Sequence, residues 1–162
     1  MPNVEELIEQ SEKLVSIFGY WPSFHDAEVL ELHFDRGAID EAGDMYRFPE
    51  LTVKILVWEL TSEIGPDGSL ISRRHTLAAI QFRGVDAFSM TGFNYHNALQ
   101  HLRIAPGELG GVGRLVVHFA GALGMEAKFH CASIRVLNAI PWEKDKPCPR
   151  WLNVDQLAKL GP

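Results

Sequence analysis

The sequence predicts an α+β domain: a mostly antiparallel, strongly bent β-sheet with an N-terminal helix and a short mid-chain helix packed on it. A barrel-like closure of the sheet is the competing arrangement. Three observations lead to this prediction. Most segments alternate apolar and polar residues at the strand period, two segments show helical spacing, and glycine-rich turns separate the strand-like segments. The chain has 162 residues, so residues 1–162 are expected to form a single domain.

The first expected element is an amphipathic helix over residues 4–18. Its apolar side chains recur at three- and four-residue spacing, and its charged side chains lie off that face. Asn3 and Glu6 resemble a capping box at its start. Gly19 is expected to end the helix.

Four strands are expected next, over residues 29–34, 51–60, 73–83 and 87–93. The second carries apolar side chains on both faces, so it is expected to be central in the sheet. The "GPDG" turn at residues 65–68 joins the second strand to the third, because proline presets φ and glycine accepts a positive φ.

A short helix is expected over residues 95–102, with Asn94 as its N-cap. Its apolar residues are expected to face the sheet, and its histidine and amide residues to face away.

The last third is expected to form a hairpin, 114–120 with 125–131, followed by a strand over 133–140. The two apolar faces must coincide, so partner numbers must sum to an even value. The register with the tightest turn has partner numbers that sum to 244, which places His118 opposite Glu126. The proline-rich tail 141–162 is expected to wrap the sheet.

Charge is divided unevenly along the chain. Residues 1–63 contain 14 acidic and 4 basic side chains, and residues 64–162 contain 7 acidic and 11 basic ones. An acidic half argues against a nucleic-acid partner and favours a basic protein partner. The expected acidic partner face comprises Glu5, Glu9, Glu12, Glu31 and Asp35.

Chemistry-bearing residues gather in "WPSFHDAE", residues 21–28, where His25, Asp26 and Glu28 are candidate metal ligands or reacting groups. The favoured interpretation is a structural corner, with Pro22 turning the chain. Glu28 shares strand parity with the apolar residues that follow it, so it is expected to need a partner such as Arg83 or His25. The alternative for Glu28 is a general base.

The chain contains none of the common catalytic motifs, so no catalytic residue, metal or cofactor is expected. Two cysteines, Cys131 and Cys148, do not form a disulfide framework, and no apolar run is long enough to cross a bilayer. A cytoplasmic protein without membrane contact is expected. Exposed apolar groups such as Leu56 or Trp151 favour a homodimer.

Three segments carry a family resemblance: "FGYWPSFHDAEVLELHFDR", "MTGFNYHNALQHLRI" and "HFAGALGMEAKFHCASIRV". In this order they resemble the immunity protein 50 family of bacterial polymorphic-toxin systems, over about residues 17–137. The resemblance implies a mostly β, non-catalytic protein that binds and neutralises a cognate toxin. The family-like framework positions are Trp21, Pro22, His25, Asp26, Glu28, Gly92, Phe93, Asn94 and Asn97. A small metal- or ligand-binding enzyme using His25, Asp26 and Glu28 is the alternative function.

Overall fold

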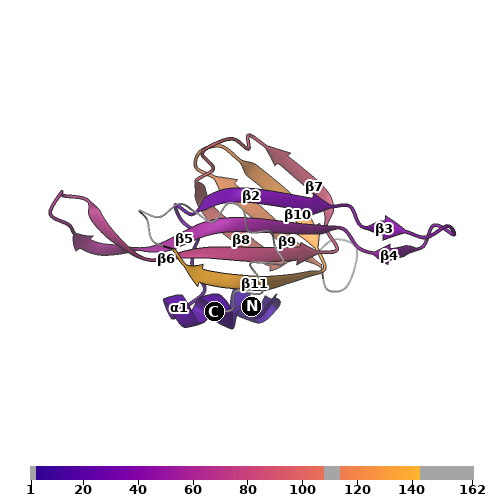
Figure 1. Ribbon diagram of the computed structural model, residues 1–162, viewed down its shortest axis with the longest axis horizontal. Coiled ribbons are helices and arrows are strands. Elements are labelled where there is room, and N and C mark those ends of the chain that lie inside the picture. The colour runs from indigo at the N-terminus through magenta and orange to yellow at the C-terminus, as the bar shows by residue number, and fades with distance from the viewer. Residues whose placement is uncertain (1–2, 108–113, 143–162) are drawn as a thin grey trace.

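Two β-sheets face each other and enclose the apolar core (Figure 1). The computed structural model describes residues 3–107 and 114–142. One sheet has five strands in the order β1-β11-β6-β5-β2, and the other has four in the order β7-β10-β9-β8. Their inner faces meet where the Phe82 ring contacts Phe119 and Phe129, at centroid distances of 5.8 and 5.1 Å.

The strands are β1 (Ile8–Glu9), β2 (Glu28–Asp35), β3 (Ala38–Ile39), β4 (Met45–Arg47), β5 (Glu50–Ile64), β6 (Leu70–Arg83), β7 (Asp86–Thr91), β8 (Leu99–Pro106), β9 (Leu115–Gly121), β10 (Glu126–Cys131) and β11 (Ser133–Pro141). The helical elements are a 3-10 turn, η1 (Val4–Leu7), and one α-helix, α1 (Glu12–Phe18). None of the described helices has the length and apolar character needed to cross a membrane.

The expected single bent sheet is wrong, and the two sheets do not close into a barrel. The chain leaves one sheet for the other at Gly84, between β6 and β7, and returns at Ala132, between β10 and β11. These crossings touch, because the Ala132 amide donates to the Arg83 carbonyl at 2.8 Å. Gly84 has a φ of +66°, and a Cβ there would lie 2.9 Å from that of Ala132. This close crossing separates the strands into two layers.

The expected helix over residues 4–18 is interrupted. Ile8 is buried and pairs in parallel with Ile134, so β1 covers the edge of β11. The helix begins only at Glu12, beyond Gln10 with a φ of +58°. Gly19 ends it in the left-handed conformation, as predicted. Burial of one apolar side chain against the sheet therefore overrides helical periodicity.

The central strands agree with prediction. β5 lies between β2 and β6, and β6 lies between β5 and β11. The Gly68 amide donates to the Gly65 carbonyl at 3.0 Å in the expected turn. β7 and β11 also lie where strands were expected.

β2 corrects the expected parity. A bulge follows Val29. Val29 is buried in the core, whereas Leu30, which was expected there, is exposed, because an extra residue shifts the side-chain alternation. Beyond the bulge the expected face holds: Leu32 packs against the core, and the partly exposed Phe34 ring lies 5.0 Å from that of Phe88.

The expected helix over residues 95–102 is wrong. The Asn94 side chain accepts from the His96 amide at 2.8 Å, forming a turn, and β8 begins at Leu99. Asn favours such turns as readily as helix caps. Pairing with β9 then buries Leu99 and Leu102 as strand residues.

The β9–β10 hairpin has the predicted faces but a different register. Partner numbers sum to 246, so His118 lies opposite Lys128 and the predicted sum of 244 is wrong. The observed register places the loop around Leu123, followed by Gly124 with a φ of +79°. A sum of 244 would pair Gly124 within the ladder, where its conformational freedom is not needed. His118 still reaches Glu126 diagonally, at 3.1 Å.

Leu56 is buried with Leu77 and Ala79 on the outer face of the five-stranded sheet. The expectation that Leu56 is an exposed dimer contact is therefore wrong. Trp151, Cys148 and the tail beyond residue 142 lie outside the described residues.

Candidate functional site

The corner at residues 21–28 is built from packing and backbone hydrogen bonds. Phe24 is buried and its ring lies 5.5 Å from that of Trp21. Phe24 and Asp26 both have positive φ, at 59° and 64°. The Asp26 amide donates to the Leu99 carbonyl at 2.9 Å, and the Leu99 amide donates to Ala27 at the same distance. The corner is thus fastened to the start of β8.

Glu28 joins this corner to the loop before β8. Its carboxylate accepts from the Asn97 amide, and its other oxygen lies 3.0 Å from the His96 Nδ1. The expectation that Arg83 or His25 is the partner of Glu28 is therefore wrong. The turn that replaces the expected helix supplies these partners.

Asn97 is the buried centre of the same network, with 2% of its surface exposed. Its side-chain amide donates to the carbonyls of Val29 at 3.2 Å and Asn94 at 2.6 Å. Its side-chain oxygen accepts from the Asn94 amide at 2.9 Å. Among the other framework positions, Gly92 accepts through its carbonyl from the Asn94 side chain, whereas Phe93 is exposed.

His25 stands outside this network. Its side chain is 62% exposed, and its Nδ1 lies 3.1 Å from the Asp26 carboxylate. Over residues 3–107 and 114–142, no group of three or more His, Cys, Asp and Glu side chains is placed to hold a metal ion. His25, Asp26 and Glu28 therefore divide between two separate pairs, His25–Asp26 and Glu28–His96.

Cys131 is the free cysteine among the described residues and is buried. Burial raises the pKa of its thiol to about 12, against a smaller lowering effect of Arg114. A thiol of that pKa is protonated at neutral pH and is a poor nucleophile.

The five acidic candidates for partner binding lie at opposite edges of the five-stranded sheet. Glu5, Glu9 and Glu12 belong to the N-terminal elements beside β11, whereas Glu31 and Asp35 lie on β2. Three strands separate the two groups.

Three of these carboxylates have cationic partners. Arg135 contacts Glu9 at 2.9 Å, Lys54 contacts Glu31 at 2.9 Å, and Arg47 contacts Asp35 at 2.7 Å. The acidic candidates thus form two separate patches, and their role in binding stays a prediction.

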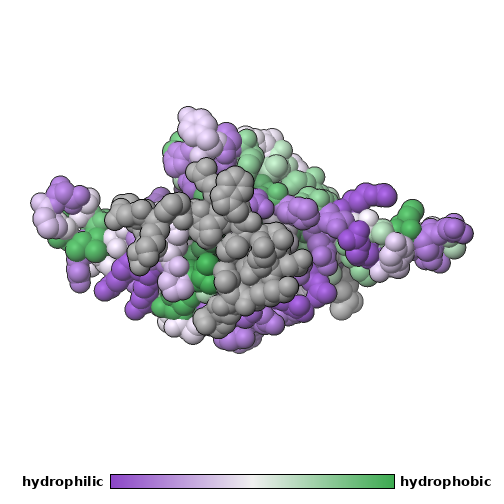
Figure 2. All heavy atoms as spheres, viewed as in Figure 1, coloured by the Kyte–Doolittle hydropathy of each residue, from purple (hydrophilic) through white to green (hydrophobic). Residues whose placement is uncertain are grey.

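A hairpin formed by β3 and β4, here called the arm (residues 36–48), projects from one end of the molecule (Figure 1). Every residue from 39 to 48 is exposed. Four of them are large and apolar: Ile39, Met45, Tyr46 and Phe48. Figure 2 shows hydrophobic and hydrophilic atoms side by side along this projection.

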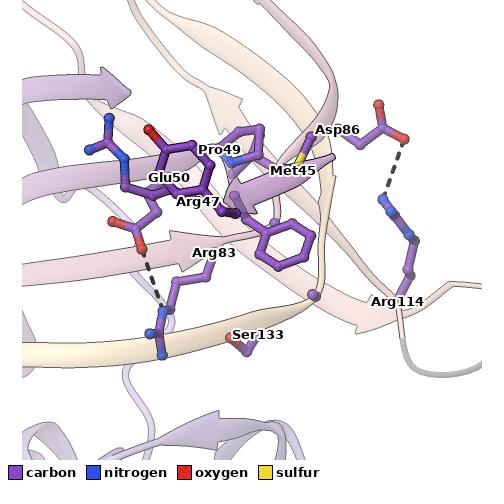
Figure 3. A pocket seen from close by; sticks show the side chains of 13 residues that line it. Met45, Arg47, Pro49, Glu50, Arg83, Asp86, Arg114 and Ser133 are labelled. Atoms are coloured by element: carbon purple, nitrogen blue, oxygen red, sulfur yellow. Dashed lines mark hydrogen bonds and ion pairs between the residues drawn. The ribbon is translucent and has the colours of Figure 1, made fainter. Parts of the chain in front are cut away.

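Beside the base of the arm lies a hollow of about 630 Å³ (Figure 3). It is lined by the arm strand β4, the crossings at residues 83–86 and 132–133, and Arg114. The charged side chains at its rim form ion pairs: Arg83 lies 3.6 Å from Glu50, and Arg114 lies 3.3 Å from Asp86. The hollow is therefore polar at its rim and bordered by exposed aromatic side chains.

Asp35 anchors the arm to β2. Its carboxylate accepts from the Gly37 amide at 2.9 Å and from Arg47 at 2.7 Å. The Gly37 hydrogen bond, followed by the Arg47 charge, lowers the pKa of Asp35 below its ordinary value. A Cβ on Gly37 would lie 2.0 Å from the Arg47 carbonyl oxygen, so the arm base requires glycine.

The arm lies between the strands expected over residues 29–34 and 51–60, and neither β3 nor β4 was expected. The sequence signal that marks it is "MYRF", residues 45–48, in which three of the four side chains are large and apolar. Such residues in a segment without strand partners indicate a surface that the chain leaves uncovered.

The family model of Immunity protein 50 matches residues 10–141. The resemblance seen over residues 17–137 is thereby confirmed. No curated protein and no solved structure matches the chain. The corner, the arm and most of the two sheets lie within the matched residues.

Proposed function

The chain belongs to the immunity protein 50 family, and from that premise we propose that it binds a cognate bacterial protein toxin in the cytoplasm and neutralises it without catalysing a reaction. The family match over residues 10–141 is the observation that carries this proposal. The geometry is compatible with it, because the Glu28 carboxylate and the Asp26 amide bind the turn before β8 and the start of β8, and so hold the corner in place.

A binding role also suits the distribution of surface features. The arm and the hollow present aromatic, methionine and arginine side chains, which are enriched in protein interfaces. The N-terminal acidic group, Glu5, Glu9 and Glu12, adds a field that attracts a basic partner. Glu31 and Asp35 are proposed to contribute at the opposite edge.

The proposal is tested with the protein domains encoded by the genes that flank this one, each expressed alone to identify a toxin domain. We expect cells that express this domain to stop growing, and cells that also express the chain to recover. Purified chain and an inactive toxin variant are expected to elute as one complex in size-exclusion chromatography.

A non-cognate immunity protein of similar size serves as the control for non-specific protection. Growth arrest that persists despite soluble, folded chain, together with separate elution of the two proteins, would contradict the proposal. Light scattering of the chain alone tests the proposed homodimer in the same series.

A further inference from the structure

We propose that the toxin docks on the arm and the adjoining hollow, and that its docking surface is basic with an apolar socket for the arm. This inference rests on the proposed function and specifies the surface that performs it.

The arm has apolar side chains that no part of the described chain covers. β3 and β4 pair only with each other within the described residues. Tyr46 is 69% exposed and Phe48 is 61% exposed. An isolated two-stranded hairpin is marginally stable, and exposed aromatics add nothing to its own folding. A partner that buries Tyr46 and Phe48 supplies the contact they lack.

The arm is nevertheless held in one shape. Asp35 binds both the Gly37 amide and Arg47 at its base. At its tip, the Asp44 amide donates to the Asp40 side chain at 2.8 Å, and the Asp40 amide donates to the Asp44 carbonyl at 2.8 Å. A surface ordered before binding loses less conformational entropy on association.

The charge of the tip indicates the chemistry of the partner. Asp40, Glu41 and Asp44 form no ion pair within the described residues, and all three are exposed. The basic groups at the rim of the hollow, in contrast, already have carboxylate partners at Asp35, Glu50 and Asp86. Arg36 at the base of the arm is also exposed and forms no ion pair within the described residues. The unpaired charge of the arm is therefore net negative and complements a basic surface.

Apolar and acidic groups are expected to act on different rate constants. Buried aromatic anchors mainly set the dissociation rate, whereas exposed charges mainly set the association rate and its salt dependence. The dissociation rate therefore tests the role of the apolar groups, and the association rate tests the role of the acidic groups.

The experiment measures binding of an inactive form of the adjacent-gene toxin domain to the immobilised full chain by biolayer interferometry. The arm variant combines Tyr46→Ser and Phe48→Ser. The matched control combines Leu60→Ser and Ile64→Ser on the β5–β6 hairpin, where exposures are 50% and 70%. We expect the arm variant to weaken binding at least about 30-fold, mostly through faster dissociation, and the control to change it less than about threefold.

A tip variant, Asp40→Asn with Glu41→Gln and Asp44→Asn, tests the charge. Asn at position 40 can still accept the Asp44 amide, so the tip shape is kept. We expect the association rate to fall and its salt dependence to weaken. Retained thermal stability of every variant shows that a loss of binding is not a loss of folding.

The outcomes separate the two proposals. No binding by the unaltered chain overturns the proposed function, and the docking inference with it. Full binding by the arm variant, with binding lost on charge reversal of Glu5, Glu9 and Glu12, overturns the docking inference alone. An association rate that does not respond to salt or to the tip variant overturns the basic character of the partner.

Discussion

β2 begins at the corner and ends at the arm, and these two regions use similar residues in opposite ways. Both contain aromatic and acidic side chains within a few positions of each other. At the corner, Phe24 is buried and Glu28 has two hydrogen-bond partners. In the arm, Tyr46 and Phe48 are exposed. Composition alone therefore does not distinguish buried framework residues from exposed ones, because the residues that pack on and bind the corner come from a distant part of the chain.

The largest effect is expected for Asn97→Ala. It removes a buried side chain that bonds Val29 and Asn94, leaving their buried groups unsatisfied. We expect the free energy of unfolding to fall by about 2–4 kcal/mol in urea titrations. The control, Gln100→Ala, alters an exposed residue nearby. If Asn97→Ala and Gln100→Ala both lower the free energy of unfolding only slightly, the corner network does not stabilise the fold as proposed.

Substitution of Glu28 separates hydrogen bonding from charge within the corner. Glu28→Ala loses both the Asn97 amide and the His96 ring as partners, and is expected to cost about 1–2 kcal/mol of unfolding free energy. Glu28→Gln keeps an oxygen acceptor for the amide, so its cost is expected to be smaller. A larger cost for Gln than for Ala in urea titrations would contradict this assignment.

His25→Ala is expected to lower the free energy of unfolding by less than about 1 kcal/mol, because the His25–Asp26 pair is exposed. Thermal denaturation at pH 7 measures the change. A loss above 2 kcal/mol would show that His25 belongs to the corner network after all.

The exposed aromatic side chains of the arm are expected to contribute little to stability. Tyr46→Ser and Phe48→Ser together are expected to change the free energy of unfolding by no more than about 0.5 kcal/mol, since both side chains are exposed. Urea titration of this variant beside Asn97→Ala provides the direct contrast. A destabilisation comparable to that of Asn97→Ala would mean that the arm aromatics serve the fold.

The smallest effect is expected for Asp35→Asn, through the pH dependence of stability. The Gly37 amide and Arg47 lower the pKa of Asp35, so the ionised carboxylate stabilises the folded state. This contribution is present above the ordinary pKa of 3.8 and is lost as the pH falls through the lowered value. The difference between the two proteins should therefore be larger at pH 7 than near about pH 2. A difference in the free energy of unfolding that grows as the pH falls would contradict this assignment.

Several features follow from local sequence signals. The apolar faces of the β9–β10 hairpin, the "GPDG" turn and the central position of β5 all depend on alternation and turn chemistry within short segments. The family resemblance, carried by continuous strings, was also available from sequence. The hairpin register was not, because parity allows both 244 and 246 and only the placement of Gly124 separates them.

The candidate site was less accessible from sequence. The sequence predicts a structural corner, but the Asn97 partner of Glu28 lies in a segment predicted as a helix, so their hydrogen bond was not predicted. The arm aromatics were not predicted as a surface feature, because they lie between the expected strands. Their exposure depends on the absence of a strand beside β3 and β4 in the described chain, which no local pattern encodes.

Local sequence signals were sufficient to predict the central strands β5 and β6, the hairpin strands β9 and β10, the "GPDG" turn and the family. Those properties depend on side-chain alternation, backbone preferences of Gly, Pro and Asn, and continuous motifs. The tertiary structure decided that the strands divide into two facing sheets, that residues 4–18 break to cover an edge, and that Glu28 meets Asn97. It also left the arm uncovered. Burial and hydrogen bonding depend on residues far apart in sequence, so only the assembled fold shows which side chains are covered and which are exposed.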